Sequence, residues 1–597
     1  MSIAGVNSKR LWRVMYVSIL LLISVVLSSC GSTALAGAAA TNTSAAPETG
    51  PITVKITNTN PEVKTAIARV LETRETDTLD QNKLAFSACL NGQHISVWAS
   101  GYYIYTILCN GNSPTEYPIA LEAINATDNS NYPWIGADSR FNPVLNCEKC
   151  HSDSSSGFNE YNEWNIDGHS RAFGSSYFWT TYMGMNINGN LGQETNWSIL
   201  GNGKRIRLPR DPTKPYYGPG YYLDFPNENG NCVFCHAPAD LSTTAQGADL
   251  SSLIYGSFGN RVNAATEGVT CDVCHKVIDV SLGQDKLPYA ERPGILSFSF
   301  VRPISSSQFA IGPRPEQATQ DADTKHTCSP VFSKSEFCAA CHYGKFSGVE
   351  IYSSYKEWLN SLYNQSGQNF RSCQDCHMPS PEPVGNTLPS ERSACSETNL
   401  KFGDFNHNMM KYGLDPDNVS RTIPLMVKDA ATVNIDEIQI SGGQINFRVT
   451  VINSGAGHKF PTDSPLRHLI LFVQVTDMFN NPLTQVGGPM IPKVGDSDYA
   501  GYPGQIYANL LKDKDTNSVP TIAYWNPVEP AGTPSDTRLV PGVPVQSGYS
   551  FIAPSNGSVT ISVRLIYRNV FFDIANQKGL MPIDVEAAAA KTQVEMP

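Results

Sequence analysis

Five short cysteine motifs constrain this 597-residue chain more than any other feature of its sequence. Each has the spacing Cys-x-x-Cys-His, and together they use ten of the fifteen cysteines. The cysteines of the motifs are Cys147 and Cys150, Cys232 and Cys235, Cys271 and Cys274, Cys338 and Cys341, and Cys373 and Cys376. A repeat this regular indicates one ligand chemistry used five times, so the fold has to accommodate five copies of the same group.

The spacing predicts a covalently attached haem c at every motif. Each thiol adds to one vinyl group of a porphyrin, and two intervening residues let both thiols reach the same ring edge. The histidine that follows then becomes the proximal iron ligand. Those histidines are His151, His236, His275, His342 and His377. Zinc sites and thioredoxin-like disulfides are the alternatives, but zinc does not require a histidine after every second cysteine, and no βαβ pattern accompanies the motifs.

Six further histidines are candidates for the second axial position of each iron. His169, His326, His407 and His458 are predicted distal ligands, because they lie near a motif or in a glycine-flanked loop that can approach a flat ring. His468 adjoins an apolar run, so a ligand and a structural role are both open, and His94 is predicted to be structural. One haem therefore has no assigned distal histidine. It could take Met409 or Met410, or stay open to a small substrate.

The N-terminus has the pattern of an export signal. Basic residues precede a short apolar run at 14–27, which predicts a signal peptide over residues 1–30. Small residues before Cys30 predict a lipobox with Cys30 as the lipidated residue, and an ordinary signal peptide with an incidental cysteine is the alternative. Gly31 is not the aspartate of an inner-membrane retention signal, so an outer-membrane anchor is expected. Residues 31–50 have the composition of a flexible linker.

Four cysteines remain, and export to an oxidising compartment favours disulfides between them. Cys89 and Cys109 bracket an apparent hairpin and form the preferred pair. Cys328 with Cys395 follows by elimination.

The pattern along the chain predicts a multidomain protein. Residues 51–140 read as a small β-rich domain, because aromatic and β-branched runs flank a Ser-Gly turn. Residues 141–424 hold all five motifs and few strand signals, so we expect a haem-wrapped, loop-rich, mainly helical core. Residues 425–597 alternate apolar and polar side chains, as over 444–452, which predicts an Ig-like β-sandwich.

The formal net charge of −11 argues against a nucleic-acid partner. It is compatible with cationic redox proteins as partners. We also expect contact with a membrane through the lipid anchor, and assembly into a larger cytochrome complex remains open.

The residues around three motifs resemble bacterial multihaem c-type cytochromes of the class related to hydroxylamine oxidoreductase and its partner tetrahaem cytochrome. The resemblance rests on residues 268–276, on 337–342, and on 373–379 preceded by Glu357 and Trp358. A second resemblance joins 455–462, with Pro465 and Arg467 after it, to the C-terminal β domain of related exported cytochromes. The resemblance to the multihaem cytochrome class implies closely stacked haems, mostly with two histidine ligands, that often serve anaerobic or extracellular respiration.

The departures from this class weaken both of its enzyme assignments. Pentahaem nitrite reductases anchor their catalytic haem at a motif that ends in lysine, whereas all five motifs here end in histidine. The tyrosine crosslink of hydroxylamine oxidoreductase cannot be placed from the sequence. We therefore expect electron transfer through five haems. The alternatives are an oxidoreductase for a small nitrogen or sulfur compound at one open haem, and a haem-bearing structural subunit of a complex or filament.

Overall fold

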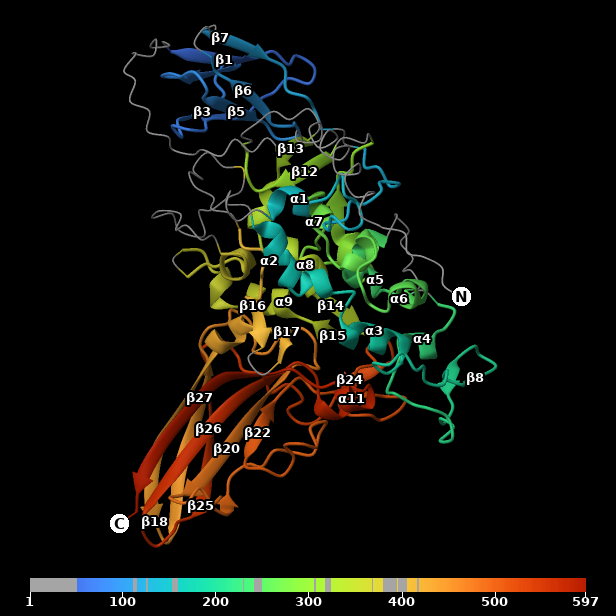
Figure 1. Ribbon diagram of the computed structural model, residues 1–597, viewed down its shortest axis with the longest axis vertical. Coiled ribbons are helices and arrows are strands. Elements are labelled where there is room, and N and C mark those ends of the chain that lie inside the picture. The colour runs from blue at the N-terminus through green and yellow to red at the C-terminus, as the bar shows by residue number, and fades with distance from the viewer. Residues whose placement is uncertain are drawn as a thin grey trace, which may run out of the picture.

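The structure, a computed structural model, describes residues 51–596 except 111–114, 125–126, 153–158, 229, 241–249, 305–307, 317–323, 368, 380–394, 396–404 and 416–417. Three regions follow one another along the longest axis of the molecule (Figure 1). An N-terminal β region lies at one end, the segment with the five motifs lies in the middle, and a β-sandwich forms the other end. No helix within the described ranges is long and apolar enough to cross a membrane.

The N-terminal region consists of two small sheets that enclose one apolar core. The sheets have the strand orders β4-β1-β7 and β3-β2-β5-β6. The bounds are β1 Ile52–Ile56, β2 Ile67–Val70, β3 Thr76–Thr78, β4 Lys83–Phe86, β5 His94–Trp98, β6 Tyr105–Leu108 and β7 Glu116–Ile119. Side chains alternate toward the shared core, as Ile52, Val54 and Ile56 do along β1. The predicted hairpin is present as β5 paired antiparallel with β6.

The middle region consists of short helices and two-stranded ribbons. Its α-helices are α1 Glu148–His151, α2 Glu160–Ile166, α3 Ser176–Met183, α4 Tyr221–Asp224, α5 Val233–His236, α6 Ser251–Ser257, α7 Cys271–Cys274, α8 Glu336–His342, α9 Ser354–Leu359 and α10 Cys373–His377. Single turns of 3-10 helix add η2 His169–Arg171, η3 Pro238–Asp240, η4 Ala264–Glu267, η5 Gly294–Ser297, η6 Pro330–Ser333 and η7 Leu362–Asn364, and η9 Leu425–Asp429 leads into the sandwich. The ribbons are β8 Trp197–Ile199 with β9 Arg205–Arg207, β10 Val277–Val280 with β11 Phe298–Phe300, β12 Gln308–Gly312 with β13 Thr324–Cys328, β14 Gly344–Phe346 with β15 Val349–Tyr352, and β16 Tyr412–Asp415 with β17 Asn418–Pro424.

The prediction of a mainly helical multihaem core is wrong. Across the molecule 33% of residues are in strands and 18% in helices, and the longest helix of the middle region, α3, has eight residues. Each motif forms about one helical turn, and the chain then leaves the helix at or just after the motif histidine. Between the motifs, frequent Gly and Pro stop helices and favour turns, so short ribbons form there instead.

The C-terminal sandwich packs two four-stranded sheets face to face. Their orders are β18-β19-β25-β21 and β22-β20-β26-β27. The bounds are β18 Ala431–Ser441, β19 Gln444–Asn453, β20 His468–Asp477, β21 Gln485–Gly487, β22 Gly504–Tyr507, β25 Pro544–Ile552, β26 Ser558–Arg568 and β27 Asp584–Glu595. A smaller ribbon of β23 Leu511–Asp513 and β24 Val528–Pro530 and the helix α11 Phe572–Gln577 lie on the side toward the motif region (Figure 1). The inward side chains of both sheets form the largest apolar core of the molecule.

Candidate haem-binding site

The five motif histidines all have one ring nitrogen engaged by an oxygen that can only accept. The distances from Nδ1 are 2.7 Å to Ala172 O for His236, 2.7 Å to Ile311 O for His275, 2.8 Å to Asp463 Oδ2 for His342, 2.9 Å to Met409 O for His377 and 3.3 Å to Glu160 Oε2 for His151. These partners place the proton on Nδ1, so the lone pair is on Nε2. A neutral imidazole held in this way is the form that binds a metal through Nε2.

Burial keeps two of these rings neutral at physiological pH. Desolvation lowers the pKa of His275 and of His377 to about 4, and the neighbouring rings of His407 and His458 lower each further. The burial of His236 also lowers its pKa. The pKa values of these three rings therefore favour the neutral form that an iron ligand requires.

Three motif histidines face a second histidine from another part of the chain. The ring centroids are 6.0 Å apart for His342 and His169, 6.5 Å for His275 and His407, and 6.2 Å for His377 and His458. Two metal–imidazole bonds of about 2 Å each separate the ring nitrogens by about 4 Å, and the centroids lie one ring radius further out on each side. The observed separations are therefore those that two rings have when they bind one iron from opposite faces.

The distal histidines of two pairs have oriented supports of their own. Asp167 Oδ1 lies 2.7 Å from His169 Nδ1, and Lys459 O lies 2.9 Å from His458 Nδ1. Both acceptors leave Nε2 available to a metal, as in the motif histidines. Three of the four predicted distal ligands, His169, His407 and His458, thus lie opposite motif histidines.

The fourth predicted distal ligand, His326, lies on β13 close to the third motif. β13 pairs in parallel with β12, with His326 opposite Ala310, and the next residue of β12, Ile311, accepts from His275 Nδ1. The role of His326 as a ligand remains a prediction.

The two remaining histidines are held by carboxylates in other places. Glu72 Oε1 lies 2.8 Å from His94 Nδ1, in the N-terminal sheets. His468 is fully buried in the sandwich, with Nε2 2.7 Å from Asp496 Oδ2, Nδ1 3.0 Å from Leu466 O, and its ring stacked on Phe571 at 4.0 Å. Both nitrogens of His468 face acceptors, which assigns it a structural role.

The thiols of different motifs lie against one another in the middle region. Hydrogen-bond contacts join Cys147 to Cys271, Cys235 to Cys341, and Cys338 to Cys373. The first motif thus neighbours the third, and the fourth neighbours both the second and the fifth. These contacts bring the attachment points of neighbouring motifs close together.

The cysteines have two states in the structure. Nine of the motif cysteines are free thiols, namely Cys147, Cys232, Cys235, Cys271, Cys274, Cys338, Cys341, Cys373 and Cys376. Cys150 is in a disulfide, and a thioether at the first motif requires that thiol to be reduced. The two pairs favoured by the sequence are both disulfides, Cys89–Cys109 and Cys328–Cys395. The predicted lipidation site, Cys30, lies outside the described residues.

One loop of the sandwich brings a histidine and a carboxylate to the motif region. This loop, residues 455–462 and the following Asp463, brings His458 to the fifth motif and a carboxylate to His342 of the fourth. Tyr363 packs against Gly457, where an added Cβ would come within 3.1 Å of the tyrosine ring, so glycine is needed for this close approach. The sandwich is therefore part of the site rather than a separate cover.

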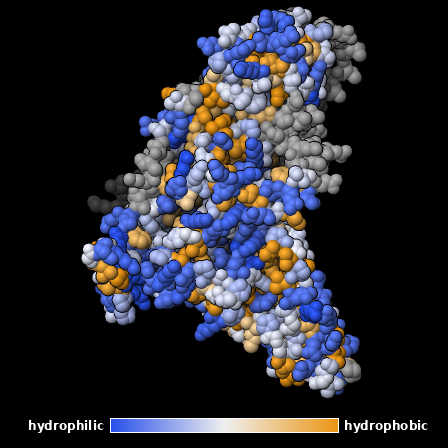
Figure 2. Space-filling model, turned by 180° about the vertical axis from the view of Figure 1, so that it is seen from behind, coloured by the Kyte–Doolittle hydropathy of each residue, from blue (hydrophilic) through white to orange (hydrophobic). Residues whose placement is uncertain are grey.

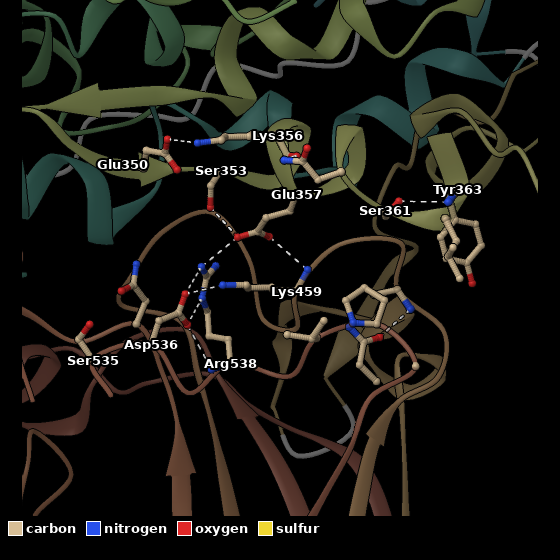
Figure 3. A pocket seen from close by; sticks show the side chains of 18 of the residues that line it. Glu350, Ser353, Lys356, Glu357, Ser361, Tyr363, Lys459, Ser535, Asp536 and Arg538 are labelled. Carbon is tan, nitrogen blue, oxygen red and sulfur yellow. Dashed lines mark hydrogen bonds and ion pairs between the residues drawn. The ribbon is translucent and has the colours of Figure 1, made fainter. Parts of the chain in front are cut away.

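An ion-pair network fastens this loop to α9. Glu357 on α9 accepts from Thr462 Oγ1 at 2.7 Å. Glu357 also pairs with Arg538 of the sandwich at 2.9 Å (Figure 3). Arg538 also pairs with Asp536, which Lys459 Nζ approaches to 2.8 Å. These groups line a cavity of about 1010 Å³ between the two regions. Their charges neutralise one another, so the network serves to position the loop.

Sequence reasoning names candidate ligand histidines but not the groups that hold their rings. Asp463, Glu160 and the carbonyls of Ala172, Ile311 and Met409 come from distant segments and carry no signal in the sequence. Asp167 is the exception, because a carboxylate two residues before a candidate ligand is a pattern that a sequence shows.

Comparisons with known proteins give one likeness to report. No family model matches the chain, and no curated protein matches it. Among solved structures, a penta-heme cytochrome c552 from Thermochromatium tepidum has a TM-score of 0.45 and 19% sequence identity, covering 75% of this chain and 97% of that chain.

Proposed function

We propose that this protein transfers electrons through five covalently attached haems. The observation that carries the proposal is the placement of three histidine pairs at 6.0 to 6.5 Å, each joining a motif histidine to a ring from another segment. Haem iron with two histidine ligands exchanges single electrons with little rearrangement. Acceptors engage Nδ1 in all five motif histidines and in His169 and His458, which leaves Nε2 of those rings available for such ligation.

The contacts between motifs support a branched order for the path. The first motif neighbours the third, Cys274 of the third acts electrostatically on both cysteines of the fourth, and the fourth also neighbours the second and the fifth. The fourth motif then lies at the junction, and the order along the path differs from the order along the chain. Anaerobic or extracellular respiration, a lipid anchor in the outer membrane and assembly with other cytochromes complete the proposal.

A second candidate function follows from the number of histidines. All eleven lie within the described ranges, and after the three pairs, His94 and His468, only His326 remains to face either His151 or His236. We assign His326 to His151, because the first motif adjoins the third, beside which His326 lies. The second motif then has no distal histidine, and its His236 stacks on Phe178 at 3.9 Å. An open position there favours an oxidoreductase that acts on a small nitrogen or sulfur compound.

Electron paramagnetic resonance of the oxidised full chain separates the two functions. Electron transfer alone predicts low-spin signals that do not respond to nitrite, hydroxylamine or sulfite. A high-spin signal from one iron per chain that shifts with one of these compounds would establish the oxidoreductase. Fewer than three low-spin irons would contradict the histidine pairs themselves.

A further inference from the structure

A two-stranded arm projects from the side of the motif region. We define the arm as residues 197–216, which contain β8, β9 and the segment after them (Figure 1). β8 and β9 pair only with each other, with Ser198 opposite Ile206. An isolated ribbon of this size is marginally stable in water, so its contacts with the body have to hold it.

One face of the arm makes those contacts. Trp197 stacks on Phe225 at 5.9 Å, and its indole nitrogen donates to Asp224 O at 3.0 Å. Arg207, opposite Trp197, pairs with the Asp224 carboxylate at 2.6 Å. These contacts hold the inner face to the body, although Ile199 at the end of this face is 70% exposed.

The outer face carries a row of exposed apolar side chains. Ser198 pairs with Ile206, Leu200 N donates to Lys204 O, and Leu208 N donates to Asn196 O, so these residues share the face opposite Trp197. The side chains of Leu200, Ile206 and Leu208 are 41%, 44% and 43% exposed, and nothing within the described part of the chain covers the row. In Figure 2 the projecting lobe at the left shows hydrophobic and hydrophilic residues side by side.

The arm is basic, on a chain that is otherwise acidic. Residues 197–216 contain five basic residues and one acidic residue, against a net charge of −11 for the whole. Arg205 and Arg207 pair with carboxylates of the body. Lys204, Arg210 and Lys214 form no ion pair with any residue that the structure describes. An apolar centre with an unpaired basic rim attracts an acidic protein surface.

The arm is rooted in the wall of the second motif. Phe225 contacts Tyr221 at 5.5 Å, and Tyr221 lies in one apolar core with Val233 and Phe234, the two residues between the cysteines of that motif. The arm therefore joins the body at the wall of the motif at one end of the proposed path.

We propose that the outer face of the arm docks an acidic redox protein, which exchanges electrons with the protein at the second motif. This docking proposal rests on the proposed electron transfer. It adds where one redox partner binds and which charge that partner carries. The net charge of the whole chain suits cationic partners, whereas the arm provides the opposite charge at one place. Two copies of an acidic chain repel each other, and Trp197, the side chain best suited to a membrane interface, is on the inner face.

Stopped-flow reduction of the haem-loaded full chain tests this proposal, with reduced flavodoxin as a small acidic electron carrier and dithionite as a small-molecule reductant. A charge variant, Lys204→Glu with Arg210→Glu and Lys214→Glu, should slow reduction by flavodoxin at least tenfold at low salt, and the loss should shrink as salt rises. A matched control makes the same charge change at exposed lysines elsewhere, Lys64→Glu with Lys493→Glu and Lys591→Glu, and should lose much less. The apolar variant Leu200→Ser with Ile206→Ser and Leu208→Ser should slow the flavodoxin reaction at all salt concentrations.

Dithionite should reduce every one of these variants as fast as the wild type. Equal rates for the charge variant and its control would overturn the docking site. A wild-type dimer that the arm variants convert to monomers in sedimentation would assign the arm to self-association instead. Binding to phosphatidylglycerol vesicles that only the arm variants lose would assign it to a membrane. If dithionite fails to reduce the wild type, the proposed function fails rather than the docking site.

Discussion

At the scale of single residues, the histidine pairs make the most specific prediction. Replacing His458 by Ala should remove one distal ligand and leave His377 unopposed. One iron per chain should convert from a low-spin to a high-spin signal, because it loses a strong ligand. Electron paramagnetic resonance measures the change, and His94→Ala is the matched control because His94 pairs with Glu72. An unchanged spectrum in the His458 variant would contradict the pairing.

Asp536 tests the network that holds the loop of His458 in place. Although burial by itself raises its pKa, hydrogen bonds and charge from Arg538 and Lys459 lower the pKa of Asp536 from 3.8 to about 2. A carboxylate with a lowered pKa stabilises the fold fully above pH 3.8, and the stabilisation is lost as the pH falls through about 2. Asp536→Asn should therefore cost about 2 kcal/mol at pH 7 and almost nothing at pH 2. Chemical denaturation at pH 7 and pH 2 measures the free energy of unfolding. The control variant Asp429→Asn, at an exposed position, should leave that free energy unchanged at both pH values.

The residue scale is also where the sequence was most informative. Covalent chemistry fixes the spacing of each motif, so motif histidines are recognisable without a fold. Their supports are not, because the carboxylate of Asp463 reaches His342 across 121 residues. Such a contact depends on how the sandwich meets the motif region, and no local pattern encodes it.

At the scale of elements, a disulfide links two segments of the N-terminal sheets, which enclose one small apolar core. The Cys89–Cys109 disulfide closes a loop of 20 residues, and its sulfurs are fully buried. Cys89→Ala with Cys109→Ala should destabilise this region by about 3 kcal/mol, mainly by freeing the unfolded chain. Hydrogen exchange of β5 and β6 measures the loss, while the haem spectrum should stay unchanged. A parallel loss of haem absorbance would show that the two regions fold together.

Strands were predictable wherever one side of a sheet faces a core, as along β19, where Ile445, Phe447, Val449 and Val451 are buried in alternation. The short ribbons of the middle region were missed, because strands of three to five residues carry too little periodicity to detect. The prediction of a helical core was wrong for a related reason. We expected longer helices around the motifs, but each motif forms only a short helix, and the Gly- and Pro-rich segments that follow do not continue it.

At the scale of the whole molecule, the site exists only because two regions meet. The motif region supplies the cysteines and proximal histidines, and the sandwich supplies His458 and Asp463. Arg538→Met should loosen this junction, because it leaves Glu357 and Asp536 with a missing partner in a largely buried network. We expect a loss of 3 to 5 kcal/mol, on the order typical of a broken buried ion pair. Limited proteolysis should then cut between the regions sooner than in the wild type, whereas Arg564→Met on the exposed face of β26 should have no such effect.

The measurement that tests the central claim most directly is the number of haems bound covalently to each chain. Intact mass under denaturing conditions, together with the pyridine haemochrome absorbance per polypeptide, gives that number. The account predicts five haems, and four after Cys373→Ser with Cys376→Ser. A mature wild-type chain with fewer than five haems would contradict this count. A chain with no haem, or with zinc in its place, would contradict the account altogether.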